Sequence, residues 1–472
     1  MTDRARPVEI RVEADPDLDR AASEAANAGV GTAGEHGASA RRWWVAGLVV
    51  LLLGAGLVVS EAVERGREVR RDARLAAIPG VVADLSVPPV PAWEGPPGWV
   101  LGTVDGALVT SVPVRASTSV AVYDTADGSV LWSRAMIPGG PEWCSGVVAE
   151  GVLCWAGAEG MGRRRGAAIV LDPVSGTERG RVEDVVVRAG AVGVEGGLVV
   201  LRDSGAGEET GMELALVDPA TGRAAWTLPL IDRFAGTPVE VEVLAVGDLV
   251  ALLGPRTYVV DPRTGEVLVD VAGRWGVVPV PGGFARRTGA HLWRVHDDSG
   301  APQAEVPGQP VEPAVSDGSE PRVLLVTDGD AYRAVDRTTG EVLWSLPDDW
   351  GSLAIRREGV VVHVADDRVE AIDLLTGERR WDWRGEELAP GQGALSDGRT
   401  VMVVAHPGGD WVGHAIDLDT GVRLWTAPLP LQAAPLEFVI PGQTPRIEAV
   451  TGGAYTVAAH REVVWWRLPG AG

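Results

Sequence analysis

The chain has 472 residues, with 42 basic against 65 acidic side chains and a formal net charge of −23 at neutral pH. This acidic balance argues against a nucleic-acid partner, because phosphate backbones select for clustered Lys and Arg. Two cysteines exclude a disulfide-rich scaffold and a cysteine-rich metal site, and the length predicts either several domains or one large repeat array.

Residues 1–40 contain Asp, Glu, Ala, Gly and Ser with few large apolar side chains, which predicts a disordered tail. Two Arg and two Trp then introduce an uncharged apolar run. Residues 43–59 reach the lower limit for crossing a lipid bilayer, about 17 residues. A cleaved signal peptide is the alternative, but the run lies late and Ser60 begins a charged sequence that is a poor cleavage site. We therefore predict a single transmembrane helix over residues 41–60.

Residues 61–98 connect this helix to the rest of the chain. Residues 61–77 have a helical composition with interleaved charges, so we expect them to continue the helix as a juxtamembrane stalk that a Pro-Gly pair ends. A Pro-rich stretch follows and predicts a stiff, extended linker. The globular part is therefore expected to begin at Trp99 and to span residues 99–472.

A short pattern recurs along residues 99–472. It begins with Asp, has Gly four positions later and Trp after four more, as in DRTTGEVLW from Asp336 to Trp344. Related copies of this pattern begin at Asp124, Asp218, Asp373 and Asp417. Copies from Asp172 and Asp261 keep the Asp and the Gly but lose the Trp, and a worn copy ends at Gly300.

Each copy lies between two short apolar runs, which predicts a β-hairpin. The Asp carboxylate can accept hydrogen bonds from backbone N–H groups of the turn, and the Gly supplies the positive φ that closes it. The Trp lies on the returning strand, where the indole buries a large apolar area and offers one N–H to a carbonyl. One hairpin cannot bury its faces alone, and a repeat of roughly 35 to 48 residues is typical of propeller blades.

The pattern resembles the tryptophan-docking repeat of PQQ-like β-propellers, over roughly Trp99 to Leu468. The resemblance implies an all-β propeller in which each repeat Trp packs against a neighbouring blade. Eight units have a recognisable or worn turn, and the end of the chain is an incomplete copy. Closed rings remove exposed strand edges, so we predict eight blades, or alternatively seven, closed between the two ends of the array. The tryptophans concerned are Trp132, Trp226, Trp344, Trp381 and Trp425.

The orientation of the predicted helix stays open. PQQ-like propellers behind a single N-terminal anchor usually face the periplasm or the cell exterior, which favours an extracytoplasmic propeller. The positive-inside rule favours the opposite orientation, because two Arg precede the apolar run and five follow it. We prefer the extracytoplasmic orientation. The five are Arg65, Arg67, Arg70, Arg71 and Arg74.

The two cysteines lie on neighbouring strand-like runs joined by a short turn near Ala149 to Gly151. Cross-strand neighbours are close enough for a disulfide when the register is right, so Cys144 and Cys154 are a candidate pair. An oxidising exterior would allow that bond to persist. The alternative is a pair of buried free thiols on one hairpin.

No motif that is typical of a catalytic or metal-binding site occurs in the sequence. The seven His form no HExxH pattern, the adjacent Asp pairs lack a calcium-loop sequence, and neither a GxSxG elbow nor a phosphate loop is present. His363 is expected to be a strand residue. Quinoprotein dehydrogenases share this propeller and bind PQQ and calcium against an adjacent Cys pair, which this sequence lacks. We therefore expect no catalytic residues, no metal site and no cofactor.

The resulting hypothesis is a non-enzymatic, membrane-anchored propeller of the cell envelope that binds a protein, peptide or glycan through loops on one face. In architecture it resembles the propeller scaffold subunit of outer-membrane protein assembly machinery. The alternative is a ligand-sensing ectodomain that works with a separate signalling partner, because residues 1–40 contain no kinase motif. A fold alone does not grant a function.

Overall fold

The computed structural model describes residues 71, 74–75, 78, 81–82, 84–95, 99–104, 106–114, 117–136, 142–148, 151–157, 165–203, 211–230, 241–347, 351–385, 387–388, 394–407, 411–429, 446–450, 454–459 and 462–467. All elements below belong to one compact unit, Ala73–Gly472. The tail predicted over residues 1–40 and the helix predicted over 41–60 lie outside the described residues. Within the described part of the chain, no helix is long and apolar enough to cross a membrane.

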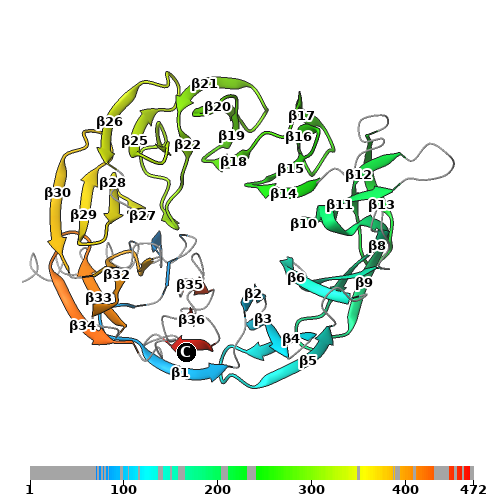
Figure 1. Ribbon diagram of the computed structural model, residues 1–472, viewed down its shortest axis with the longest axis horizontal. Coiled ribbons are helices and arrows are strands. Elements are labelled where there is room, and N and C mark those ends of the chain that lie inside the picture. The colour runs from blue at the N-terminus through cyan, green and yellow to red at the C-terminus, as the bar shows by residue number, and fades with distance from the viewer. Residues whose placement is uncertain are drawn as a thin grey trace, which may run out of the picture. The chain divides into compact units, whose positions relative to one another are not determined.

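This unit is an all-β propeller, in which successive sheets surround a central opening (Figure 1). The described strands form eight sheets, six of which have four strands each. The first two of these sheets consist of β2 (Trp99–Val104), β3 (Ala107–Val114), β4 (Ser117–Asp124) and β5 (Val130–Met136), and of β14 (Glu242–Val246), β15 (Leu249–Leu253), β16 (Arg256–Val260) and β17 (Val267–Ala272). The next two consist of β18 (Val277–Val280), β19 (Gly283–Arg287), β20 (Leu292–Asp297) and β21 (Pro302–Pro307), and of β22 (Gln309–Pro310), β24 (Val323–Thr327), β25 (Ala331–Asp336) and β26 (Val342–Pro347). The last two consist of β31 (Ala394–Ser396), β32 (Thr400–Ala405), β33 (Val412–Asp417) and β34 (Arg423–Pro428), and of β1 (Val90–Gly95), β35 (Arg446–Val450), β36 (Ala454–Ala459) and β37 (Glu462–Arg467).

The other two sheets have five and eight strands, and a short 3-10 helix, η1 (Val187–Ala189), lies within the larger one. The five-stranded sheet consists of β23 (Val315–Ser316), β27 (Ser352–Arg357), β28 (Val360–Val364), β29 (Arg368–Asp373) and β30 (Arg379–Arg384). The eight-stranded sheet consists of β6 (Glu142–Val148), β7 (Gly151–Gly157), β8 (Arg165–Leu171), β9 (Glu178–Val186), β10 (Ala191–Val194), β11 (Gly197–Asp203), β12 (Met212–Val217) and β13 (Ala224–Pro229).

The burial of each strand follows its position within the sheet. Middle strands such as β15 and β32 are buried along their whole length, because a neighbouring sheet covers each of their two faces. Their sequences are accordingly continuous apolar runs rather than alternating ones. Outer strands such as β13 and β34 alternate exposed with half-buried residues, and the repeat Trp occupies a half-buried position.

The repeat turn has the hydrogen bonds to Asp and the positive φ at Gly that the sequence predicts. In the copy that begins at Asp336, the backbone N–H of Gly340 donates to the Asp336 carbonyl at 2.8 Å. The Asp336 carboxylate accepts from the backbone N–H groups of Thr338 and Thr339 at 2.8 and 3.1 Å. Gly340 has φ 75°, in the region that favours glycine.

Each repeat Trp reaches into the next repeat along the chain. Its indole N–H donates to the carbonyl of the residue that follows the turn Asp of that repeat, or, for the last Trp, to Leu85 after Asp84. Sequence reasoning missed Trp93, whose N–H points to the Thr125 carbonyl at 3.4 Å. The other pairs are Trp132 with Pro173 (2.9 Å), Trp226 with Pro262 (2.7 Å), Trp344 with Leu374 (2.8 Å), Trp381 with Leu418 (2.8 Å) and Trp425 with Leu85 (2.7 Å).

The prediction of eight blades, or seven, is wrong, since six sheets are regular four-stranded blades. One reason is Gly180, which stands where the repeat would place Trp. A Cβ atom there would lie 2.3 Å from the Pro219 carbonyl oxygen. Without an indole as spacer the two units approach closely enough for β9 to pair with β11, and they merge into the eight-stranded sheet. The other reason is β23, which pairs in parallel with β27 and adds a fifth strand.

The ring closes between the two ends of this unit, because β1 pairs antiparallel with β37. The segment before β1 supports the closure: the Leu85 N–H donates to the Asp397 carboxylate at 2.8 Å, and the Leu85 carbonyl accepts from Trp425. The structure thus differs from the linker predicted over residues 61–98. Its Pro content indicated an extended chain, and an extended chain is also what an outer strand needs.

Candidate functional site

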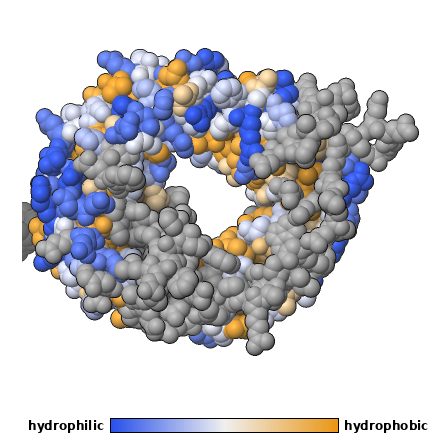
Figure 2. Space-filling view, in the orientation of Figure 1, coloured by the Kyte–Doolittle hydropathy of each residue, from blue (hydrophilic) through white to orange (hydrophobic). Residues whose placement is uncertain are grey.

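A hollow of about 700 Å³ lies where the inner strands of successive units meet. We call it the apolar hollow. Figure 2 shows hydrophobic surface along the wall of the central opening. None of the lining residues is charged or aromatic. They are Thr103 and Val104 on β2, Ser145 to Val148 on β6, Leu153 on β7, Ala191 to Gly193 on β10, and Val243 to Ala245 on β14.

Two glycines let the strands around this hollow approach one another. A Cβ atom at Gly193 would lie 2.6 Å from the Val148 Cβ, and one at Gly102 would lie 2.5 Å from a Val147 methyl carbon. Distances this short do not occur between real side chains, so larger residues would push β10 and β2 away from β6. The glycines therefore set the width of the apolar hollow.

The backbone edges beside the hollow are unpaired on their inner side. Within the described strands, β6 pairs only with β7, β10 only with β11 and β14 only with β15. The contrast is β27, whose inner edge is covered by β23. An uncovered strand edge offers a row of N–H and C=O groups to another extended chain. Apolar side chains and free backbone edges thus lie at the same place.

A smaller pocket of about 240 Å³ borders the hollow and shares Val192, Gly193 and Ala245 with it. Its other end is polar, since Glu195, Asp248 and Arg263 belong to its lining. We call this end the polar rim. An extended ligand could therefore place apolar side chains in the hollow and polar groups at its rim.

The cysteines and the repeat tryptophans lie at different places. Cys144 and Cys154 are opposite one another on β6 and β7, are buried, and are joined by a disulfide. Cys144 directly precedes Ser145, so the bond braces a strand that lines the hollow. The five repeat tryptophans lie on outer strands, and none of them lines the apolar hollow. Sequence reasoning missed the hollow residues altogether.

A buried charged group lies elsewhere, inside the five-stranded sheet. His363, on β28 as expected, and Glu370 on β29 are fully buried, with the His363 Nδ1 3.1 Å from a Glu370 carboxylate oxygen. Burial opposes ionisation of Glu370, but the hydrogen bond from His363 and the charge of Arg379 keep the pKa of that carboxyl below its usual value. These contacts offset part of the cost of burying a charge inside a sheet. No cluster of His, Cys, Asp or Glu among the described residues could hold a metal ion.

No curated protein matches the chain. Among solved structures, BamB from Moraxella catarrhalis is 16% identical, with a TM-score of 0.38 over 78% of this chain and 100% of that one. Quinohemoprotein alcohol dehydrogenase from Comamonas testosteroni is 13% identical, with a TM-score of 0.40 over 80% of this chain and 76% of that one.

A family model also matches the chain. It carries the description "Outer membrane protein assembly factor BamB" and matches residues 116–272 and 280–464, well over half of the sequence. Both matched segments consist mainly of the strands and repeat turns described above. The chain therefore belongs to the family described as outer membrane protein assembly factor BamB.

Proposed function

We propose that this protein is a non-enzymatic scaffold that binds an extended segment of a partner protein in the apolar hollow. The observation that carries the proposal is the uncharged lining of a concave site in a chain of net charge −23. The hollow combines small aliphatic side chains with strand edges that are unpaired within the described strands, and an extended chain can use both. The family description, which names protein assembly, supports a protein as the partner.

The chemistry of the lining favours a peptide segment over a glycan. Sugar rings are held by aromatic faces and dense hydrogen-bonding groups, whereas the hollow is lined by small aliphatic residues such as Val148 and Leu244. The unpaired edges of β6, β10 and β14 are suited to the backbone of an extended chain. A partner segment with alternating apolar side chains fits both features.

A quinoprotein reaction is not part of the proposal. That chemistry uses a disulfide between adjacent cysteines as a surface for the cofactor. Here Cys144 and Cys154 are ten positions apart and bridge two strands. The residues present therefore do not fit PQQ.

The proposal places the propeller in the cell envelope, anchored through residues 43–59 to the bilayer. The apolar run of the sequence supports this placement. The native cysteines are buried, so the test uses a new cysteine at Val342, which is 42% exposed on β26. Labelling of Val342→Cys by a membrane-impermeant maleimide in intact cells supports an extracytoplasmic propeller. Labelling only after lysis places it in the cytoplasm.

Binding in the hollow is tested with Ala245→Arg, which introduces a charge into the lining at an exposed position of β14. The matched control is Ala225→Arg, at an exposed position of the outer strand β13. We expect the wild type and the control to retain the same partner after mild solubilisation and crosslinking, and Ala245→Arg to lose it. Equal recovery by all three proteins would contradict the proposal.

A further inference from the structure

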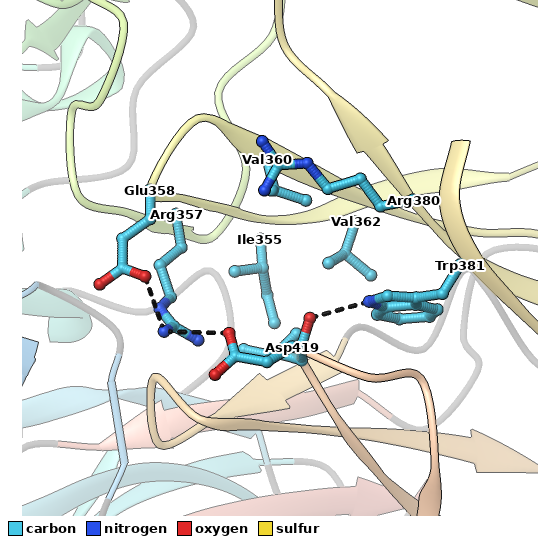
Figure 3. A pocket seen from close by; sticks show the side chains of 9 residues that line it. Ile355, Arg357, Glu358, Val360, Val362, Arg380, Trp381 and Asp419 are labelled. Atoms are coloured by element: carbon cyan, nitrogen blue, oxygen red, sulfur yellow. Dashed lines mark hydrogen bonds and ion pairs between the residues drawn. The ribbon is translucent and has the colours of Figure 1, made fainter. Parts of the chain in front are cut away.

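A second pocket, of about 270 Å³, lies between the turn that joins β27 to β28 and the turn that joins β33 to β34 (Figure 3). We call it the junction pocket. Its apolar residues are Ile355, Val360, Val362, Trp381 and Leu418, and its charged residues are Arg357, Glu358, Arg380 and Asp419. It shares no residue with the apolar hollow or with the polar rim.

The Arg357 guanidinium is the unusual group in this pocket. Arg357 is only 5% exposed, and its Nε has no hydrogen-bond partner among the described residues. Both of its ion pairs use Nη2, which lies 2.9 Å from a Glu358 oxygen and 3.4 Å from an Asp419 oxygen. A buried N–H of a charged group that stays unpaired is costly, which makes this edge of the guanidinium a site for an acceptor.

The present partners of Arg357 are replaceable. The Glu358 and Asp419 side chains are 54% and 59% exposed, and pairs with solvated carboxylates contribute little to stability. Glu358 also has φ 49°, an uncommon backbone angle for a residue with a side chain. Withdrawal of Glu358 into solvent would uncover the Nε and Nη2 edge, the geometry that binds a carboxylate through two hydrogen bonds.

A second cation and an apolar floor complete the site. Arg380 on β30 extends alongside Val360, and the half-buried Val360 and Trp381 form the apolar floor (Figure 3). Its Nη2 lies 2.7 Å from an Asp373 oxygen, and the side chain is half exposed. Trp381 closes one side of the floor, where its indole is fixed by the Leu418 carbonyl.

We propose that the junction pocket binds a carboxylate carried on a short apolar arm, with Arg357 as the direct partner and Arg380 as the second cation. The arm packs on the half-buried Val360 and Trp381, and the carboxylate replaces Glu358 on the guanidinium. The source of the carboxylate is either the C-terminus of a peptide that ends in an aliphatic residue or an acidic side chain. This site is independent of the apolar hollow, so either can exist without the other.

Three short peptides distinguish these sources when titrated calorimetrically into the full chain. The first ends in Val with a free carboxylate, the second is its C-terminal amide, and the third is an amide with Glu in place of the last Val. Binding of the first alone identifies a chain end, and binding of the third identifies an acidic side chain. The uncharged amide should bind at least about tenfold more weakly than the carboxylate that fits. Failure of both carboxylates to bind, or equal binding of the uncharged amide, would overturn the proposal.

Variants assign the binding to the pocket. Arg357→Lys keeps the charge but loses the two-bond geometry, and Arg357→Gln loses both, so affinity should fall about tenfold or more in each. Arg380→Gln should weaken binding by a smaller factor. Arg384→Gln is the control, because Arg384 lies on β30 with Arg380, is 73% exposed and is outside the pocket. Unfolding curves establish that each variant is folded. Unchanged affinity in both folded Arg357 variants would contradict the assignment, and Ala245→Arg should leave the peptide affinity unchanged.

Discussion

The glycine four residues after a turn Asp can have two separate reasons to lack a side chain, its backbone angle and the packing of a neighbouring indole. Gly265 has φ 77°, and a Cβ atom there would also lie 2.8 Å from the indole of Trp226. Gly222 has nearly the same angle, φ 68°, but a Cβ atom there would meet nothing within 4 Å, because Gly180 replaces the Trp of the preceding unit. This pair separates the backbone requirement from the packing requirement.

Gly222→Ala should therefore lower the free energy of unfolding by about 1–2 kcal/mol, the cost of the left-handed backbone alone. Gly265→Ala should cost about 1–3 kcal/mol more, because the methyl group must displace the Trp226 ring. Urea unfolding of the two variants measures the difference. Equal losses of unfolding free energy in the two variants would show that the packing of the Trp226 indole does not require a glycine at position 265.

The Trp226 indole combines apolar packing with one hydrogen bond to the Pro262 carbonyl at 2.7 Å. Trp226→Phe keeps most of the packing and should cost about 1 kcal/mol for the lost donor. Trp226→Ala should cost about 3 kcal/mol, because it also leaves a space between two sheets. Val422→Ala, at a side chain 59% exposed on the surface, is the control and should be nearly neutral. Equal losses of unfolding free energy in Trp226→Phe and Trp226→Ala, measured by chemical unfolding, would contradict separate contributions from packing and from the hydrogen bond.

The turn carboxylates make stability depend on acid. The pKa of Asp172 is lowered to about 2, chiefly because its carboxylate accepts a hydrogen bond from the backbone N–H of Ser175. A hydrogen bond from the Ser175 side chain adds to this effect. The unfolded chain keeps an ordinary pKa near 4, so this stabilisation is complete above that pH and is lost as the pH falls toward 2. Other carboxyls with lowered pKa values are Asp218, Asp297, Asp328, Asp336 and Asp373.

We therefore expect the urea midpoint of unfolding to be steady from pH 6 to 5 and to fall between about pH 4 and 2. Asp172→Asn keeps the Oδ1 acceptor but cannot ionise, so its midpoint should change less over that range. A wild-type midpoint that does not fall in acid would show that the turn carboxylates are not preferentially ionised in the native state.

At the scale of strands and turns, the sequence predicted much of the local structure. The spacing from Asp336 to Gly340 and Trp344 predicts a turn and a returning strand, and the structure has both. The merging of two units could not be predicted, because it depends on what is missing at Gly180 rather than on a motif. Trp93 was missed because it lies in a Pro-rich stretch and outside the repeat spacing.

The disulfide is an element-scale constraint, since it joins β6 to β7 across ten positions. Opening a loop of this length in the unfolded chain should lower the free energy of unfolding by about 2–3 kcal/mol in the chain-entropy treatment. Urea unfolding with and without a reductant measures this change. The double variant Cys144→Ser, Cys154→Ser should resemble the reduced protein and should not respond to the reductant. A wild type that is insensitive to reduction would show that the bond contributes nothing.

At the scale of the whole molecule, the apolar hollow could not be predicted from the sequence. Most residues that line the hollow are Val, Leu, Ala and Gly, which also dominate the buried middle strands. Only the packing of successive units side by side brings Val148, Ala191 and Leu244, which are far apart in sequence, onto one wall. The net charge of −23 argued against nucleic acid, but it gave no location for a partner.

The most direct test of binding in the hollow is site-specific photocrosslinking in intact cells. A photoreactive amino acid is placed at Ala245 in the hollow and, as the matched control, at Ala225 on the outer strand β13. We predict that the Ala245 probe captures one defined protein through a single extended segment rich in apolar residues, and that the Ala225 probe does not. No adduct at Ala245, or the same mixture of adducts at both positions, would contradict a binding role for the apolar hollow.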